Sequence, residues 1–311
     1  MRVTAFAGGV GGAKLIDGLA ACLPPKDLTV IVNTGDDFDF LNLHISPDID
    51  TICYTLAGIS NPETGWGIIN DNWTVLDNLK KLGGPAWFQI GDKDFSTHIE
   101  RTRRLHNGET LSAITEHFCN VWGVKIKVLP MTNDPVSTCI KSIDFGDLPF
   151  QDYFVRLRCK PVIKTIEFKG VNSAKPAPGV EDAISEAEVV IICPSNPWVS
   201  IDPIISLKGI LQKLINKPSI AISPIIHGKA VKGPAAKMFK ELGIEPSALA
   251  VADHYKKFVN AIVIDNKDHD LENDIKRLGL NTFITNTLMV SKETRIQVAK
   301  DVLNFCERII D

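Results

Sequence analysis

The chain contains 311 residues, of which 44% are apolar and 23% are charged, and its formal net charge is −3. At roughly 150 residues per domain, this length allows two domains or one large domain with an insertion. The composition excludes disordered, collagen-like and disulfide-framework chains, and the charge balance excludes a global basic field that would attract nucleic acid.

The cysteines and the apolar runs indicate the compartment. Seven cysteines are scattered through the chain without a Cys-x-x-Cys pair, which is typical of buried thiols in a reducing cytoplasm. The first residues lack the apolar length of a secretory signal, and no run of about 18 apolar residues predicts a membrane span. We therefore expect a cytoplasmic protein that binds neither membrane nor nucleic acid.

Short continuous apolar runs, rich in β-branched residues, predict strands buried on both faces of a parallel sheet. Helical patterns lie between several of them, and this alternation at both ends of the chain predicts a Rossmann-like, doubly wound, mostly parallel α/β sheet. The predicted strands cover residues 3–7, 28–32, 126–129, 189–193, 220–222, 249–251, 261–264 and 282–285. The predicted helices cover residues 13–23, 204–215, 233–242 and 292–310.

Residues 1–311 are interpreted as a single α/β domain with two departures from the regular alternation. Residues 36–125 form a mainly helical insertion over the carboxyl edge of the sheet, with helical patterns at 73–82, 97–107 and 111–122 and four of the five tryptophans. Residues 150–170 alternate between polar and apolar, which predicts a small antiparallel element. Apolar residues at helical spacing in the last helix, such as Val302 and Phe305, motivate the expectation of a homodimer.

The sharpest local signal is a glycine-rich turn that directly follows the first predicted strand and opens a helix. It contains Gly8, Gly9, Gly11 and Gly12, and amides at a helix start favour an anion such as a phosphate. A dinucleotide fingerprint fails here because Lys14 stands where a small residue is needed, and no Walker A loop follows. The alternative is a strand–helix turn without a ligand.

Two carboxylates, Asp48 and Asp50, lie two residues apart in an acidic segment after the second strand. Either one suits the N-cap of a helix. Carboxylates near a phosphate loop also suit Mg²⁺ binding or proton acceptance from a hydroxyl nucleophile. Both interpretations stay open on composition alone.

A second short apolar stretch, which contains Trp87 and Gln89, ends in a Gly-Asp turn at Asp92. Its aromatic residues suit one wall of a pocket for a flat ring, although such residues are more often part of a core.

Two loops that follow later strands carry polar residues. One contains Ser195 and Asn196, and the other contains Lys229 and Lys232. Loops at the carboxyl ends of parallel strands meet at one edge, where open α/β sheets bind ligands. The lysines therefore suit a diphosphate clamp, or they are ordinary loop residues.

These motifs occur together and in order, and as a set they closely resemble the 2-phospho-L-lactate transferase family of coenzyme F-420 biosynthesis, known from methanogenic archaea. The resemblance covers nearly the whole chain. It is carried by residues 7–14, 33–37, 46–51, 91–94, 97–98, 129–134, 194–197, 223–226 and 228–234.

The resemblance implies transfer of a 2-phospholactyl group from lactyl-2-diphospho-5′-guanosine to the deazaflavin alcohol Fo, with release of GMP and a requirement for Mg²⁺. Asp50 would touch the acceptor as a catalytic residue, with Asp48 beside it, and the two would hold the metal. Trp87, Gln89 and Asp92 would line the acceptor pocket. The residues implied for the guanosine diphosphate part are Gly8, Gly9, Gly11, Gly12, Lys14, Ser195, Asn196, Lys229 and Lys232.

Two rival functions remain. Relatives of this fold bind nucleotide sugars as regulators, and they would share the glycine turn but not the acidic segment or the aromatic pocket. A nicotinamide-dependent dehydrogenase is disfavoured by Lys14 in the failed fingerprint. The sequence does not distinguish a lactyl donor from a phosphoenolpyruvyl donor.

Overall fold

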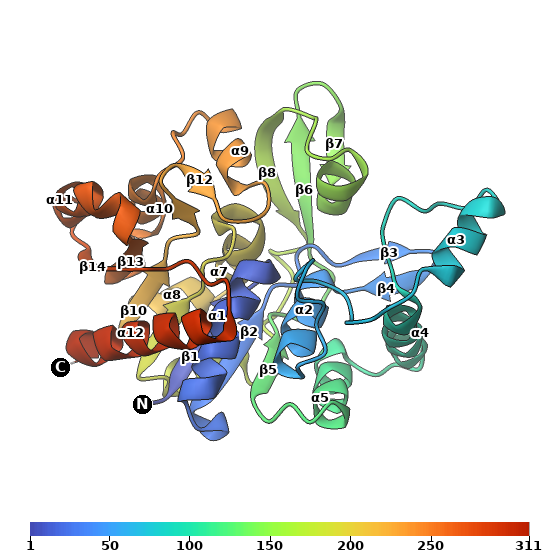
Figure 1. Cartoon of the computed structure of the whole chain (residues 1–311), viewed down its shortest axis with the longest axis horizontal. Helices are drawn as coiled ribbons and strands as arrows, with labels where there is room; N and C mark the ends of the chain where they lie inside the picture. The colour runs from blue at the N-terminus through green and yellow to red at the C-terminus, as the bar shows by residue number, and fades with distance from the viewer. Residues whose placement is uncertain (311) are drawn as a thin grey trace.

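The computed structural model describes residues 1–310 and contains one central seven-stranded parallel sheet (Figure 1). The strand order is β14-β13-β10-β9-β1-β2-β5, so the chain runs outward from β1 in one direction and returns to β9 to run outward in the other. All six pairings are parallel. The strands are β1 (Val3–Ala7), β2 (Leu28–Val32), β5 (Lys127–Pro130), β9 (Val189–Ile192), β10 (Ser219–Ile222), β13 (Ala261–Asp265) and β14 (Asn281–Thr285).

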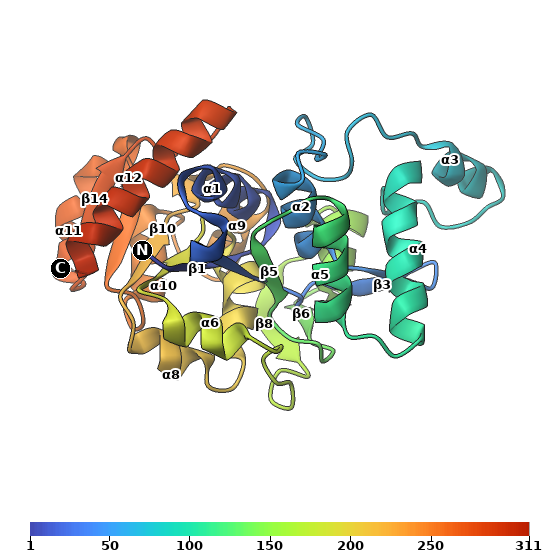
Figure 2. The same ribbon diagram turned by 90° about the horizontal axis from the view of Figure 1, so that it is seen from below.

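The central strands are buried on both faces, as their continuous apolar sequences require. Phe6 of β1 joins the hydrophobic cluster on one face, whereas its neighbour Ala5 joins the cluster on the other. Figure 2 shows α1 (Gly9–Cys22) and α12 (Lys292–Ile310) on one side of the sheet and α6 (Val180–Glu186), α8 (Ile210–Ile215) and α10 (Ala248–Tyr255) on the other. The doubly wound α/β prediction is therefore confirmed.

Residues 36–125 carry a projecting arm and the helices that connect it to the sheet. The arm comprises the hairpin β3 (Phe38–Phe40) and β4 (Leu43–Ile45) with α3 (Thr74–Lys81) and α4 (Asp92–His106), at the right of Figure 1. It has a small core of its own, built from Phe40, Ile45, Ile90 and Phe95. The connecting helices are α2 (Pro47–Leu56) and α5 (Leu111–Val121).

An antiparallel sheet of three strands stands beside the central sheet, in the order β7-β6-β8. It is formed by β6 (Ser137–Ser142), β7 (Gly146–Pro149) and β8 (Ile163–Lys169). It therefore begins before residue 150, and the alternating residues just after that position form a π-helical turn, Asp152–Arg156, instead of a strand. Alternation over so few residues did not distinguish the two conformations.

Two other local predictions are wrong in detail. The apolar run at 249–251 is part of α10, because a short apolar run fits a buried helix as well as a strand. The helix predicted at 204–215 is split into α7 (Asp202–Ser206) and α8, since Gly209 between them has a positive φ of 87°. The remaining elements are β11 (Ile225–Ile226), β12 (Lys229–Ala230), α9 (Ala235–Glu241) and α11 (Glu272–Arg277).

The apolar residues in the middle of α12 face inward, whereas Ile310 at its end is exposed. Val302 and Phe305 belong to the cluster between α12, α1 and the sheet, so they form no free apolar face, and the homodimer stays a prediction. Within residues 1–310, none of the helices has both the length and the apolar character that a bilayer span requires.

Candidate active site

The candidate site lies where the loops after β1 and β9 meet. Strand order reverses between these two neighbouring strands, and open α/β sheets bind ligands outside the carboxyl ends at such a point. Ser195, which follows β9, locks the two loops together: the Gly8 amide donates to its Oγ at 3.1 Å, and that hydroxyl donates to the Gly8 carbonyl at 2.7 Å. The predicted proximity of Ser195 to the glycine turn is therefore present.

The glycines of the turn are needed because the backbone is closely surrounded. A Cβ on Gly8 would collide with the Asp48 carboxylate, and a Cβ on Gly11 would collide with the Pro194 carbonyl oxygen. Gly9 has a φ of +61°, which only glycine adopts without strain. Helix α1 begins at Gly9 and not at residue 13, so the glycines form its first turn.

Asp48 caps the amino end of α1 from the start of α2. The first turn of α1 has no acidic residue of its own, and Asp48 Oδ1 accepts a hydrogen bond from the Gly9 amide at 2.6 Å. A carboxylate therefore occupies the place where a helix start favours an anion. This contact brings Asp48 to the glycine turn, as predicted.

Asp48 shares a buried amide with a second carboxylate, Asp36. Asn33 Nδ2 donates to Asp36 Oδ1 at 3.0 Å and to Asp48 Oδ2 at 2.9 Å. Burial raises the pKa of Asp48 to about 7, and burial together with the charge of Asp48 raises the pKa of Asp36. The only other side chain bonded to Asp36 is the neutral amide of Gln151, at 3.2 Å, so these two carboxylates lack a cationic partner among the described residues.

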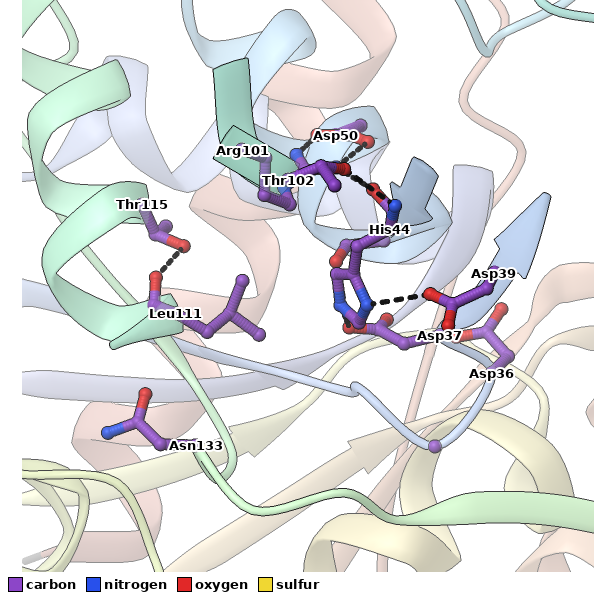
Figure 3. Close-up of polar contacts among 12 residues, drawn as sticks. Asp36, Asp37, Asp39, His44, Asp50, Arg101, Thr102, Leu111, Thr115 and Asn133 are labelled. Carbon is purple, nitrogen blue, oxygen red and sulfur yellow. Dashed lines mark hydrogen bonds and ion pairs between the residues drawn. The ribbon is translucent and has the colours of Figure 1, made fainter. Parts of the chain in front are cut away.

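Asp50 has different partners from Asp48, and its carboxylate is paired with a cation. Figure 3 shows its carboxylate facing Arg101 of α4, which donates to both oxygens, from Nη1 at 3.1 Å and from Nη2. His98, one turn earlier on α4, places Nδ1 3.7 Å from Asp50 Oδ2. All three side chains are buried. Asp48 and Asp50 therefore belong to two separate clusters, which does not suit a metal held by both.

Below Asp50, Figure 3 shows His44 between Asp37 and Asp39. Its Nε2 lies 3.3 Å from Asp37, and its Nδ1 lies 3.4 Å from Asp39. Asp37 also accepts a hydrogen bond from the Ser46 hydroxyl at 2.7 Å. These contacts fix the segment between β2 and α2, and with it the position of the two carboxylates at the start of α2.

Positive charges gather beside the glycine turn. Burial lowers the pKa of Lys14, and the nearby charges of Arg295 and Lys232 lower it further. Arg295 Nη1 lies 3.0 Å from Asp17 Oδ2, and this is the only carboxylate that the three cations engage within residues 1–310. Such mutual repulsion is the arrangement expected of a site that awaits an anion.

The structure gives Lys229 and Asn196 other neighbours, and their role in donor binding stays a prediction. Lys229 is exposed and lines a separate cavity of about 210 Å³ with Lys267 and Asn286. Asn196 caps the turn that follows it, because its Oδ1 accepts a hydrogen bond from the Trp198 amide at 3.1 Å.

A larger cavity, of about 340 Å³, lies between the 61–71 segment and the start of α4. Its walls include Trp66, Trp73 and Asp94. Lys232 Nζ donates to the carbonyl oxygen of Thr64, which is another lining residue, so the cavity adjoins the cationic side of the glycine turn. This volume falls within the range of small-molecule sites.

The residues predicted to line an acceptor pocket are elsewhere on the arm. Trp87 packs edge-on against Phe40 at a centroid distance of 5.2 Å, Gln89 is exposed, and neither lines the cavity. Asp92 caps α3, accepting hydrogen bonds from the Thr74 and Val75 amides at 3.3 and 3.0 Å.

Several residues at the site were not predicted as site residues. Asn33 belongs to the 33–37 motif of the resemblance but had no role assigned, and Arg101 belongs to an ordinary polar stretch. Their burial and bonding partners distinguish both. Trp66 and Trp73 follow Gly-, Asn- and Asp-rich turns, and that setting is a weak indication of an exposed loop. Within the described part of the chain, no set of three or more His, Cys, Asp or Glu residues is arranged to hold a metal ion.

Comparison with known proteins gives concordant results. The family model described as 2-phospho-L-lactate transferase CofD matches residues 3–301. A phosphoenolpyruvate transferase of Streptomyces coelicolor is 38% identical over 316 residues, which cover 99% of each chain. A 2-phospho-L-lactate transferase of Methanosarcina mazei is 38% identical over 298 residues, which cover 96% of this chain and 98% of the relative.

Among solved structures, protein BH3568 of Bacillus halodurans superposes with a TM-score of 0.65 over 100% of this chain and 99% of that chain. At 17% sequence identity, this likeness supports the fold alone.

Proposed function

The chain belongs to the CofD family of 2-phospho-L-lactate transferases, and from that membership and the geometry of the site we propose that it transfers a 2-phospholactyl group from lactyl-2-diphospho-5′-guanosine to Fo, releasing GMP. The observation that carries the proposal is a group of cations beside the glycine turn that adjoins a cavity of about 340 Å³. The turn is flanked by Lys14 and Lys232, and Lys232 also contacts a cavity wall at Thr64.

The donor diphosphate would lie at the amino end of α1. The helix dipole favours negative charge there. Because the Gly9 amide is already bonded to Asp48, the lysines beside the turn would supply the contacts to the diphosphate. Lys14 and Lys232 would neutralise the diphosphate, which removes the repulsion that lowers the pKa of Lys14. Ser195 would hold the turn in shape through its two bonds to Gly8.

The acceptor ring would occupy the cavity beside Trp66 and Trp73. Indole rings offer flat apolar faces for stacking with a fused aromatic ring. Trp87 and Gln89 do not line this cavity, so we propose Trp66 and Trp73 for the ring in their place. That Asp50 touches the acceptor stays a prediction, and its present partner is Arg101.

Asp48 and Asp36 fit Mg²⁺ better than Asp48 and Asp50 do. The first two are buried, share one amide and lack a cationic partner among the described residues, whereas Arg101 already neutralises Asp50. Mg²⁺ is commonly held by one or two carboxylates together with substrate phosphates. Bound there, it would supply charge neutralisation for the diphosphate.

The reaction requires an acceptor hydroxyl oxygen to attack the phosphorus of the phospholactyl group, while the bond from that phosphorus to the GMP oxygen breaks. In a loose transition state the attacking oxygen forms little bond, so alignment and charge neutralisation contribute more than a strong base. The glycine turn and the two lysines would hold the donor, and the cavity would align the acceptor. No covalent enzyme intermediate is needed.

A phosphoenolpyruvyl donor is the second candidate. It is favoured by the Streptomyces coelicolor relative named phosphoenolpyruvate transferase, whose identity to this chain, 38%, equals that of the Methanosarcina mazei relative. The two donors differ only in one unsaturation of a three-carbon acid.

The test is binding followed by turnover. Fo binding is followed through the fluorescence of the deazaflavin, with and without GDP and Mg²⁺, and product formation is then compared for the lactyl and phosphoenolpyruvyl guanylates by mass spectrometry. Saturable Fo binding that changes with GDP, followed by phosphodiester formation, supports the transferase. Binding of nucleotide sugars without any Fo binding contradicts it and favours the regulatory function.

A further inference from the structure

Asp94, at the start of α4, places a carboxylate in the wall of the 340 Å³ cavity. It is the most buried of the three acidic residues there, with an exposed fraction of 8%, whereas Glu63 is exposed and Asp71 is half-buried. A buried carboxylate at a cavity wall requires partners for both of its oxygens.

One oxygen of Asp94 is anchored from two sides. The Tyr54 hydroxyl of α2 donates to Oδ1 at 2.6 Å, and His98 Nε2 lies 3.4 Å from the same oxygen. Arg101 Nη1 lies 3.3 Å from His98 Nδ1. In that contact the guanidinium can only donate, and the ring presents its Nε2 side to Asp94.

The other oxygen is free. Within residues 1–310, no hydrogen bond reaches Asp94 Oδ2, and the backbone amide of Asp94 is satisfied separately by Asp71 at 3.1 Å. Burial acts to raise the pKa of Asp94, but the interactions with His98 and with the Tyr54 hydroxyl outweigh it and lower the pKa. The carboxylate is thus ionised at neutral pH, with one oxygen held and one open.

We propose that Asp94 is the acceptor-recognising carboxylate of the cavity, and that its Oδ2 accepts a hydrogen bond from a hydroxyl of the ribityl chain of Fo. The inference rests on the proposed function, because it presumes that the cavity takes the acceptor. Tyr54 and His98 act as positioning residues, since they fix Oδ1 and leave Oδ2 directed at the ligand. Tyr54 lies on α2 and His98 lies against Asp50 of α2, and the first turn of this helix contacts the glycine turn through Asp48, so α2 links the cavity wall to the donor side.

A chain hydroxyl fits the position better than the ring does. The two indoles of the cavity wall provide stacking surface for the fused ring, whereas an ionised oxygen is matched by a hydroxyl donor in a charge-assisted hydrogen bond. A ring N–H is the competing donor, and a deazaflavin that carries a methyl group instead of the ribityl chain distinguishes the two.

The experiment measures dissociation constants of Fo, of the methyl deazaflavin and of GDP for the full chain and two variants. Asp94→Asn should weaken Fo binding by about tenfold or more, as expected for loss of a hydrogen bond to a charged group. It should leave the constants for GDP and for the methyl deazaflavin within about twofold, because neither ligand makes the lost contact. Glu63→Gln is the matched control, since it removes an equal charge from the same cavity wall at an exposed position.

Unchanged Fo affinity in Asp94→Asn overturns the inference and leaves the proposed function standing. An equal loss for Fo and the methyl deazaflavin also overturns it, because the contact would then be to the ring. A wild type that binds GDP but neither deazaflavin overturns this inference and the proposed function together.

If Asp94→Asn does not fold, Tyr54→Phe removes one anchor while keeping the carboxylate, and it should weaken Fo binding by about threefold or more without changing GDP binding. Unchanged Fo binding in Tyr54→Phe would then overturn the inference.

Discussion

Arg101 on α4 binds both carboxylate oxygens of Asp50 on α2, and both side chains are buried. The pair joins the projecting arm to the helix whose first turn contacts the glycine turn. The pair also gives Asp50 a structural role, that of joining α2 to α4, which its place in the sequence does not indicate. A carboxylate held in this way can align neighbouring groups, but it is a poor ligand for a metal ion.

Breaking this pair should destabilise the fold strongly. Arg101→Met leaves the Asp50 carboxylate buried without its cation, which typically costs about 3–5 kcal/mol in the free energy of unfolding. Urea unfolding measures the change. Arg103→Met on the exposed side of α4 is the matched control, because its ion pair with Glu100 lies at the surface and should contribute about 1 kcal/mol or less. Equal stability of the two variants would contradict the buried-pair interpretation.

Asp50→Ala should lower turnover by about a hundredfold, because loss of its pair with Arg101 would shift α4, and a misplacement of about 1 Å can cost that much. The same change leaves Arg101 without its partner, so turnover must be measured at a temperature where circular dichroism shows the variant to be folded. Turnover near the wild-type value in the folded variant would remove Asp50 from the chemistry.

Asp48 should make stability depend on pH. Burial raises its pKa in the folded chain to about 7, above the ordinary value of roughly 3.9 that it has when unfolded. A raised pKa means that the folded state binds the proton more tightly. The resulting stabilisation is complete below about pH 4 and is lost as the pH rises through 7.

Asp48→Asn should therefore flatten the fall in melting temperature between about pH 4 and pH 8, since the amide does not ionise. Asp77→Asn, at an exposed position of α3, should leave the fall unchanged. If Asp48 and Asp36 hold Mg²⁺, adding the ion at pH 8 should raise the melting temperature of the wild type and not that of Asp48→Asn. An identical Mg²⁺ response in both proteins would place the ion elsewhere.

The three lysines predicted from sequence to bind the donor should contribute differently to GDP affinity. Lys14→Gln and Lys232→Gln should each weaken GDP binding by about tenfold, the effect of losing a hydrogen bond to a charged group. Lys229→Gln, whose side chain is exposed at the second cavity, should change GDP affinity by less than about twofold. Calorimetric titration with GDP and with guanosine measures this, and guanosine binding should be insensitive to all three. A loss in Lys229→Gln equal to the other two would restore the clamp predicted from sequence.

The glycine turn should not tolerate a methyl group at Gly11. The added Cβ would collide with the backbone carbonyl of Pro194, which cannot rotate away as a side chain can. Gly11→Ala should therefore cost roughly 1–3 kcal/mol, the usual effect of overpacking, and it should weaken GDP binding by moving the loop after β9. A variant as stable as the wild type, with unchanged GDP affinity, would show that the two loops are not packed as described.

The sequence by itself determined the features that depend on neighbouring residues. Continuous apolar runs predict β1 and β2 at their observed bounds. The long amphipathic pattern predicts α12, Lys292–Ile310. The glycine-rich sequence at the start of α1 is also visible locally, although the contacts with Asp48 and Pro194 that require these glycines are tertiary. Local pattern was insufficient at 249–251, where three apolar residues satisfy a helix and a strand equally.

Only the tertiary structure decided which polar groups meet. Asn33 joins Asp36 to Asp48, and Arg101 selects Asp50 over Asp48, although the two carboxylates are two residues apart. Residues two apart on a helix point to nearly opposite sides, since each residue advances the helix by about 100°. Their partners come from elements far away in the chain. Burial makes an unpaired charge costly, so the fold decides which carboxylates are paired. The cavity at Asp94 and the group of cations around Lys14 likewise form only when distant segments pack together, and no local motif indicates them.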